Sequence, residues 1–418
     1  MLKIIVLGGG VVGISTAYFL TQADHEVTVV ERREGPGLET SFANGGQISV
    51  SHAAPWSRPE LPGQLIRWIG RRDAPFRMVP QPDLDMWRWG IAFLRNCNSS
   101  RFHENAVRLQ RLSTYSQEML TRVRESSGIQ FHHTARGILS VFRSQEAFDA
   151  AAVHAEALRD EGVNKEVLDV NSCFSREPAL RNSDVPIRGG VFSPLDECGD
   201  AHIFTCELAD HCSRRGVTML YDTHVQTIDT VGGKAIGVTT DQGHLAADAV
   251  VIALGSESPR LARPLGIKLP IYPVKGYSVT IPIEGRNQAP SMGIADEERK
   301  IVVARLGDKL RAAGTAELVG YDRRIDERRA HSVLKPMLEL FPNGGDADKV
   351  EFWIGLRPMT PDGSPVIGQT DIQNLYLNTG HGSVGWTLAC GSARLVSDMI
   401  SGTQSDVNPT VWSLGRYH

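Results

Sequence analysis

Apolar and polar residues follow a strand–helix–strand pattern over the first 30 positions of the chain. Residues 3–7 and 26–30 are short apolar runs rich in β-branched side chains, which is typical of buried parallel strands. Between them, the segment VVGISTAYFLTQ repeats its apolar residues at helical spacing. The pattern therefore predicts a βαβ unit at the start of the chain.

Glycines lie where the first strand of this unit meets its helix. Gly8, Gly10 and Gly13 have the GxGxxG spacing, and Val11 and Val12 stand at the predicted start of the helix. Such a turn lets a pyrophosphate approach the backbone amides at a helix N-terminus. These residues predict a dinucleotide site, and a glycine-rich turn that serves only packing is the alternative.

Glu31 ends the second strand, about 20 residues after the glycines, where an acidic side chain holds a ribose hydroxyl. Its charge disfavours the 2′-phosphate of NADP. Arg32 and Arg33 would favour that phosphate, but beside a carboxylate they are more simply solvated or ion-paired. Arg32 is also a candidate cofactor contact.

An irregular polar loop follows Glu31 instead of another βα unit, which favours FAD over NAD as the cofactor. Such a loop can line an extended cofactor with backbone amides. Its candidate cofactor contacts are Ser41, Asn44, Gly45, Gln47 and Ile48.

Three alternating runs further along the chain, at 224–230, 235–240 and 245–254, predict an antiparallel meander that leads back into a strand. Val225 and Gly255 are its candidate cofactor contacts. Three distant segments would thus converge on one site, as in FAD proteins with a discontinuous cofactor domain. No cysteine is placed for covalent flavin attachment, so we expect non-covalent FAD.

The segment LNTGHGSVGWTLACG, residues 377–391, repeats the strand–glycine–helix pattern near the other end of the chain. If residues 375–378 form another parallel strand, the loop reaches the same crevice as the first one. The helix would aim its N-terminal amides at the flavin ring. A helix start with no ligand is the alternative. The candidate contacts are Gly380, Gly382, Gly385, Trp386 and Thr387.

The middle of the chain predicts a second domain. Residues 83–127 show helical periodicity, with Trp87, Phe93 and Leu94 among the residues expected on one face, and 144–162 form another helix closed by Gly162. Strands are expected at 137–142, 268–283 and 300–316. The predicted fold is α/β, with a Rossmann-like FAD-binding domain and a second α+β substrate domain of antiparallel sheet plus helices. We assign 1–82, 190–258 and 348–418 to the first domain, and 83–189 and 259–347 to the second.

Composition narrows the classes of function. The chain has 418 residues and a formal net charge of −4, which argues against a general nucleic-acid binder. Its six cysteines show no CxxC pair and no metal-like spacing, so we expect neither disulfides nor a metal site. No run of 18 apolar residues occurs, and we expect a cytoplasmic protein.

Several long segments resemble the D-amino-acid dehydrogenase family, within the wider group of glycine oxidase, sarcosine oxidase and D-amino-acid oxidase. They are LGGGVVGISTAYFL, LETSFANGGQIS, AAPW, FLRNC, YPVKGYSVTIPI, GLRPMTPDGSPVIG and LNTGHGSVGWTLACG. The resemblance covers almost the whole chain. It implies oxidative deamination of D-amino acids to 2-oxo acids and ammonia by hydride transfer to flavin N5, with electrons passed to a quinone or another acceptor such as a dye.

Flavin amine oxidation needs orientation more than acid–base residues, but it needs a cation for the substrate carboxylate. Arg357 matches the arginine of the GLRP motif that holds this carboxylate in glycine oxidase-like relatives. Such relatives can carry a second arginine where this chain has Ser383. A structural role for Arg357, paired with Asp362, is the alternative.

Three other residues are weighed for the same site. Tyr277, and with it Tyr272, could donate a hydroxyl to the substrate carboxylate or simply pack on the sheet. Lys275 could lie near flavin N5 or face water. His381 could face flavin or substrate, or be a turn residue.

Residues 61–76 combine Trp68 and aliphatic residues with Arg67, Arg71 and Arg72. This combination would suit peripheral contact with the anionic inner face of the cell membrane. A packed loop is the simpler interpretation.

Two alternatives to the main function remain. One is a dehydrogenase of a cyclic D-imino acid, such as D-proline or cis-4-hydroxy-D-proline. The other is an FAD-binding assembly protein without turnover.

Overall fold

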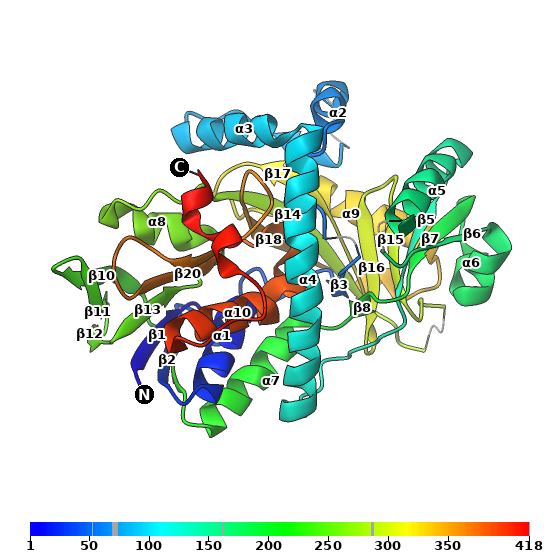
Figure 1. Ribbon diagram of the computed structural model, residues 1–418. Coiled ribbons are helices and arrows are strands. Elements are labelled where there is room, and N and C mark those ends of the chain that lie inside the picture. The colour runs from blue at the N-terminus through cyan, green and yellow to red at the C-terminus, as the bar shows by residue number, and fades with distance from the viewer. Residues whose placement is uncertain (52, 69–73, 161–162, 286–287, 418) are drawn as a thin grey trace.

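The computed structural model describes residues 1–51, 53–68, 74–160, 163–285 and 288–417, and two large sheets form its framework (Figure 1). The first sheet has six strands in the order β19-β20-β13-β1-β2-β9, all parallel except β19. Its strands are β1 (Lys3–Leu7), β2 (Glu26–Val30), β9 (Thr218–Leu220), β13 (Ala249–Ile252), β19 (Val366–Gln369) and β20 (Leu375–Thr379). The predicted βαβ unit therefore lies at the centre of a sheet whose other strands come from much later in the chain.

Helices and a small sheet cover the two faces of this first sheet. On one face, α1 (Val11–Gln22) packs between α10 (Gly385–Ser401) and α7 (Ala201–Arg214), and the long helix α4 (Ser99–Ser127) crosses over α10 (Figure 1). A buried apolar core joins these helices to the sheet. The meander β10 (Val225–Val231), β11 (Lys234–Thr240) and β12 (Gly243–Ala246) packs on the other face.

The second sheet has nine strands and is mostly antiparallel, in the order β18-β14-β17-β16-β15-β5-β7-β6 with β4 paired to β17. Its strands are β4 (Phe76–Met78), β5 (Ile138–Phe142), β6 (Glu166–Leu168), β7 (Gly189–Ser193), β14 (Tyr272–Pro282), β15 (Gly293–Asp296), β16 (Ile301–Leu306), β17 (Lys309–Leu318) and β18 (Glu351–Met359). Helix α9 (Glu327–Leu340) packs on one face through a buried apolar core.

The remaining elements connect or cover the two sheets. They are α2 (Leu61–Trp68), α3 (Leu84–Asn96), α5 (Gln145–Asp160), α6 (Val170–Arg176), α8 (Ser258–Ala262), a 3₁₀ turn at Gly382–Val384, and the short pair β3 (Gln47–Ile48) and β8 (Glu197–Cys198). In Figure 1, α2 and α3 lie together at one edge of the molecule, and the N-terminal end of α4 meets them there.

The predicted α/β fold with a second, mainly antiparallel domain is confirmed, with local corrections. The helical stretch 83–127 is two helices, because the side chain of Asn98 accepts a hydrogen bond from the Arg101 amide and starts α4 anew. Phe93 is buried, whereas Trp87 and Leu94 are 45% and 50% exposed, so the prediction that these three residues share one face was wrong.

The predicted strand 245–254 is also divided, into β12 and β13, which belong to different sheets. The boundary predicted at 348 would place β18 in the first domain, but β18 is hydrogen-bonded to β14 in the second sheet. Gly162, predicted to close α5, lies outside the described residues. None of the described helices has both the length and the hydropathy needed to cross a bilayer.

Candidate active site

A cavity of about 990 Å³ lies between the two sheets, where the C-terminal ends of β1, β13 and β20 meet one face of β14, β17 and β18. It is large for a ligand site, since small-molecule pockets typically span about 300–1,000 Å³. The predicted cofactor residues that line it are Gly8, Gly10, Val11, Val12, Glu31, Arg32, Ser41, Asn44, Gly45, Gln47, Val225, Gly255, Gly382, Gly385, Trp386 and Thr387. The structure therefore brings together residues from all the segments that the sequence analysis singled out.

The first glycine loop is shaped by close packing. Gly8 has φ +110°, and a Cβ there would lie 2.7 Å from the Ala253 carbonyl oxygen. A Cβ on Gly13 would lie 1.9 Å from the Gly8 carbonyl oxygen, so Gly13 lets α1 pack against the turn and does not itself line the cavity. Gly10 caps α1 without any side-chain hydrogen bond, which leaves the helix end open to an anion.

Glu31 and the arginines beside it lie as the sequence suggested. The Glu31 carboxylate is buried and accepts hydrogen bonds from the amides of Gly9, at 2.7 Å, and Arg33, at 2.9 Å. Burial raises its pKa, although these two bonds oppose the shift. Both Arg32 and Arg33 form ion pairs with Glu39, at 2.8 and 3.1 Å. The two arginines are thus neutralised by an acid, which supports the interpretation of them as ion-paired.

The last glycine loop brings a second open helix end to the same cavity. Gly382 has φ +57°, and the 3₁₀ turn it begins leads directly into α10, whose start has no side-chain cap. Gly380 and Ile48 do not line the cavity. At Gly380, φ is +77° and a Cβ would lie 2.8 Å from Cγ2 of Thr360, so this glycine permits the loop to pack.

Two residues of α10 that line the cavity form side-chain hydrogen bonds with neighbouring segments. The Thr387 hydroxyl accepts a hydrogen bond from the Ser49 amide, and the Trp386 indole donates to the Gly199 carbonyl. From the polar loop after β2, the Ser41 hydroxyl likewise accepts from the Val11 amide, 3.1 Å away. These bonds hold the polar loop against α1 and α10, so the three segments form one wall.

Arg357 lies on β18 with its half-buried side chain in the cavity. Its guanidinium donates to the carbonyls of Thr315, at 2.7 Å, and Gly314, at 3.5 Å, and lies 5.6 Å from the ring centre of Trp56. Burial lowers its pKa to about 10, so the group stays cationic at neutral pH. No carboxylate in the described part of the chain forms an ion pair with it. Asp362, the partner expected if Arg357 were structural, is paired with Arg416 instead, at 2.8 Å.

Two backbone features make room for Arg357. A Cβ on Gly276, in the neighbouring strand β14, would lie 2.3 Å from Cζ of Arg357. Thr315 has φ +54°, which is strained for a β-branched residue, at a point where the register between β14 and β17 shifts. This bulge turns the Thr315 carbonyl toward the guanidinium. Both features therefore fix the position of the Arg357 guanidinium.

Tyr277 and Lys275 lie on the opposite face of β14 from Arg357. Pairing of Val274 with Arg357 and of Tyr277 with Ile354 puts these two pairs on opposite faces, because side chains alternate along strands. The Tyr277 hydroxyl donates to Glu317, at 2.9 Å. Tyr277 lines the cavity, but its hydroxyl is bonded within a buried ion cluster, so its contact with a substrate carboxylate stays a prediction.

Lys275 belongs to the same cluster and neither approaches the cavity nor faces water. Its ammonium group is buried, donates to the Arg324 carbonyl at 3.0 Å and lies 3.6 Å from Glu317. Tyr272 donates its hydroxyl to Asp83, at 2.8 Å, and is likewise occupied. The hydroxyls of the two predicted tyrosines thus both donate to carboxylates within the fold.

His381 lines the cavity but is buried and lies 2.9 Å from the Ser392 hydroxyl through Nε2. The Ser392 hydroxyl also lies 3.1 Å from the Ala389 carbonyl, so it has two neighbours to which it can donate. Burial lowers the pKa of His381 to about 3, so the ring is neutral at physiological pH. The position suits a wall residue better than a general base. Ser383, where relatives can carry a second arginine, also lines the cavity.

Sequence reasoning missed an aromatic lobe of the cavity. The rings that line this lobe are Trp56, Trp68, Phe76, Trp89 and Phe93. Trp89 and Phe93 stack with ring centres 5.0 Å apart on the inner face of α3, and the Trp89 indole donates to the Met359 carbonyl. The helical periodicity of α3 marked Phe93 as inward-facing, but no local pattern links it to Trp56 or Phe76, which belong to other elements.

The residues of this cavity fit an FAD molecule. Two helix ends without side-chain caps have free amides from which a pyrophosphate and the anionic edge of a flavin would accept hydrogen bonds, and Glu31 would face a ribose. Gly45 shows how closely the polar loop approaches the second sheet, because a Cβ there would lie 2.8 Å from Cγ2 of Val302. No cluster of metal-binding side chains occurs among the described residues.

Comparisons with known proteins agree with this geometry. The family model described as FAD dependent oxidoreductase matches residues 3–399. A D-amino acid dehydrogenase from Granulibacter bethesdensis is 46% identical over 416 residues, and one from Rhizobium rhizogenes is 45% identical, each matching all of both chains. Among solved structures, glycine oxidase from Geobacillus kaustophilus has a TM-score of 0.75 at 21% identity, with 99% of each chain covered. L-Proline dehydrogenase from P. horikoshii has a TM-score of 0.73 at 18% identity, covering 99% of this chain and 97% of that one.

Proposed function

Because the chain belongs to the FAD dependent oxidoreductase family, we propose that it is a D-amino acid dehydrogenase that converts D-amino acids to 2-oxo acids and ammonia. The observation that carries this proposal is Arg357, a cation in the wall of the cavity with no acidic partner among the described residues. A half-buried charge without a counter-ion loses part of its hydration, and a carboxylate ligand would supply the missing charge. FAD, when bound, supplies the acceptor for the hydride from the substrate Cα.

The residues of the chain bind and orient the substrate in this proposal. The guanidinium of Arg357 has five N–H donors, and its two bonds to Thr315 and Gly314 leave others for a carboxylate. Those carbonyls fix its direction, so the carboxylate end of the substrate is held at one place in the cavity. The neutral ring of His381 adds no charge to the wall beside the cofactor segment.

The aromatic lobe indicates which side chains the substrate carries. The Trp56 ring lies 5.6 Å from Arg357 and packs against the apolar cluster that contains Trp89 and Phe93. A carboxylate held by Arg357 would place the substrate side chain among these rings. We therefore propose that apolar and aromatic D-amino acids are preferred, because the rings of this lobe offer apolar contact, while Arg58, Glu60 and Gln64 line the cavity from the segment that carries Trp56.

A cyclic D-imino acid is the second candidate substrate, because a compact apolar ring also fits among aromatic side chains. A panel of D-phenylalanine, D-alanine, D-proline, cis-4-hydroxy-D-proline and D-glutamate with a dye acceptor separates the candidates. We expect D-phenylalanine to have a kcat/KM at least about tenfold above that of D-glutamate. Preference for D-proline or its hydroxylated form would favour the second candidate.

Anaerobic addition of the same substrates tests turnover itself. Bleaching of flavin absorbance near 450 nm is expected with a D-amino acid and not with its L-enantiomer. A tightly bound yellow cofactor that no amine substrate bleaches would instead favour an assembly protein without turnover.

We further propose that electrons pass to a lipid-soluble quinone and that the protein contacts the membrane peripherally. Arg71 and Arg72, which supported this contact in the sequence, lie outside the described residues.

A further inference from the structure

Four charged side chains form a closed ring of ion pairs in the wall of the cavity. Arg32 lies 2.8 Å from a carboxylate oxygen of Glu39 and 3.6 Å from one of Glu257. Arg323 pairs with the same two acids, because it donates to Glu39 and lies 3.7 Å from Glu257. Each arginine therefore bridges both carboxylates, and all four side chains line the cavity. We call these four residues the ion-pair ring.

The ion-pair ring joins segments that are far apart in the chain. Arg32 follows β2, Glu39 belongs to the polar loop after it, and Glu257 lies in the turn that follows β13. Arg323 comes from the second sheet instead, in the connection between β17 and α9. We call this connection, residues 319–326, the strap. The strap therefore crosses from the second sheet onto two segments that line the cofactor part of the cavity.

Further contacts hold the strap beside the cavity. The Tyr321 hydroxyl donates to the Ser256 carbonyl, at 2.7 Å, and the guanidinium carbon of Arg260 lies 3.5 Å from the centre of the Tyr321 ring. On the side of the second sheet, the buried ammonium group of Lys275 donates to the Arg324 carbonyl, at 3.0 Å. The strap is thus attached to both sheets, and its own arginine completes the ring.

The ion-pair ring lies at the boundary between the cavity and solvent. The side chains of Arg32, Glu39, Glu257 and Arg323 are 34%, 26%, 18% and 40% exposed, in that order. Burial alone would raise the pKa of Glu39, but its bonds with Arg323 and Arg32 lower that pKa on balance, so the carboxylate stays ionised at neutral pH. An isolated exposed ion pair contributes little, whereas a network held by arginine forks contributes more.

We propose that the ion-pair ring is a gate that closes over bound FAD and slows its release. Arg32 adjoins Glu31, which would face a ribose, and Glu257 lies two residues after Gly255, another residue of the cavity wall. At the ring, ion pairs between side chains close the wall, so this part can open without unfolding a strand or a helix. FAD would therefore enter and leave here, once Arg323 parts from its two acids. This inference rests on the FAD cofactor of the proposed function and not on its substrate.

Release of FAD from the holoenzyme tests the gate without any substrate. After rapid dilution, the fall in flavin fluorescence anisotropy reports the rate at which FAD leaves. Arg323→Gln should release FAD about tenfold faster than the wild type, because the strap loses its bonds to both acids. Arg323→Lys should be intermediate, since an ammonium group keeps the charge but lacks the arginine fork. High salt should speed release from the wild type and change release from Arg323→Gln little.

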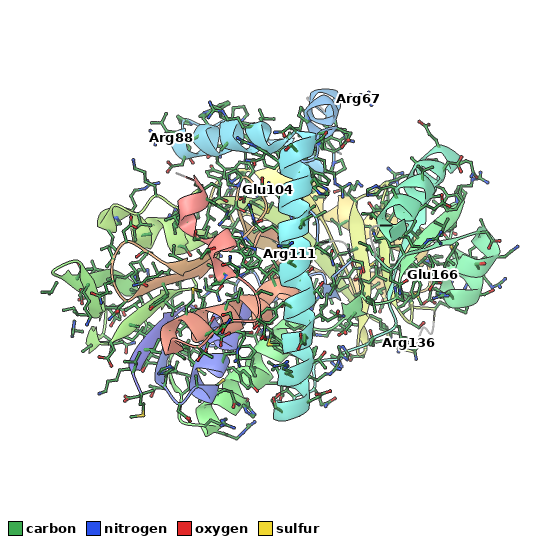
Figure 2. All side chains as sticks on the ribbon, in the orientation of Figure 1. Arg67, Arg88, Glu104, Arg111, Arg136 and Glu166 are labelled. Carbon is green, nitrogen blue, oxygen red and sulfur yellow. The ribbon has the colours of Figure 1, made fainter. Side chains whose placement is uncertain are left out.

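Matched variants separate the ring from a general loss of charge. Arg324→Gln changes the neighbouring arginine of the strap, which is 90% exposed and lies outside the ring, and it should release FAD at the wild-type rate. Glu257→Gln should speed release as Arg323→Gln does. Glu166→Gln breaks a pair with Arg176, at 3.0 Å, on the strand β6 at the far end of the second sheet (Figure 2), and should not.

Three results would overturn the proposal. They are an Arg323→Gln variant that releases FAD at the wild-type rate, wild-type release that salt does not change, and an equal acceleration in Arg324→Gln or Glu166→Gln. Urea unfolding of the apoproteins checks the fold, and if Arg323→Gln fails to fold, Glu257→Gln makes the same test from the other side of the ring. Dye-linked turnover is measured separately. Gated release of FAD without oxidation of any D-amino acid would contradict the proposed function alone.

Discussion

The two faces of strand β14 contact cations that are held in opposite ways. On the cavity face, Arg357 is bound by two backbone carbonyls and has no carboxylate partner among the described residues. On the other face, Lys275 and Arg329 both lie within ion-pair distance of Glu317, at 3.6 and 3.3 Å, and Tyr277 donates to the same carboxylate. The same sheet thus contains a cation without an acidic partner, suited to a ligand, and cations neutralised within the fold. The difference teaches that pairing, more than burial, separates a binding residue from a structural one.

Replacing Arg357 should have the largest effect on activity. Arg357→Met should lower kcat/KM for a D-amino acid by about 10²–10³-fold, because the substrate carboxylate loses its charge-assisted bonds. Stability should stay constant or rise, since a buried cation without a counter-ion is replaced by an apolar side chain. Steady-state kinetics and urea unfolding measure both. Arg214→Met, on the exposed end of α7, is the matched control. A kcat/KM within threefold of the wild type would contradict the role of Arg357.

Glu317→Gln should reverse this pattern. It leaves Lys275 and Arg329 without their carboxylate, so the free energy of unfolding should fall by about 3 kcal/mol or more. The KM of the folded enzyme should change little, because the cluster faces away from the cavity. Glu118→Gln, which breaks an exposed pair with Arg122, should cost less than about 1 kcal/mol in the same urea titration.

The pH dependence of stability tests the burial of His381. Its pKa in the folded state is about 3, below its ordinary value of 6.5, so the unfolded state takes up the proton first as the pH falls. The neutral ring therefore costs nothing above pH 6.5 and about 2 kcal/mol of stability at pH 5. His381→Gln should lose that much less stability than the wild type between pH 7 and pH 5. Equal losses in both proteins would show that His381 titrates normally.

Gly276→Ala should displace Arg357 without removing it. The new Cβ would lie within 2.3 Å of the guanidinium carbon, and the flexible arginine side chain would have to move. We expect KM to rise by about tenfold, since a misplaced cation loses part of its hydrogen-bond geometry. Gly90→Ala on α3, where a Cβ meets open space, is the control and should leave KM unchanged.

Tyr277→Phe should have the smallest effect. Loss of the hydroxyl that donates to Glu317 should lower the free energy of unfolding by about 1 kcal/mol and leave KM at the wild-type value. A tenfold higher KM with unchanged stability would place the hydroxyl at the substrate, and the contrast between the two faces would no longer hold.

The segments of the site could be predicted because their signals are local. The glycine turns around Gly8 and Gly382 directly follow strands. The segment around Lys275 and Gly276 alternates in the sequence as a strand does. Which face of that strand meets the cavity depends on packing against α9, and no local pattern reports it. For this reason the sequence did not show that the Tyr277 hydroxyl is bonded to Glu317.

Other features escaped prediction because they join distant positions. The aromatic lobe brings Trp56 and Phe93 together from separate elements, and the strained turn at Thr315 becomes visible only in the backbone angles. On α3, the periodicity identified a helix correctly, but Trp87 and Leu94 share its apolar character with the buried Phe93. A helix with apolar residues on both sides gives no signal that distinguishes the core from the surface.

The order of strands in the first sheet has a consequence for synthesis on the ribosome. Strand β1 lies between β2 and β13, and α1 packs against α10, which begins at Gly385. In the nascent chain, the apolar segments β1 and α1 therefore lack their packing partners β13 and α10 while more than half of the protein is translated. Until then these apolar segments are exposed, as in an aggregation-prone folding intermediate. We therefore expect a chaperone to bind the nascent chain.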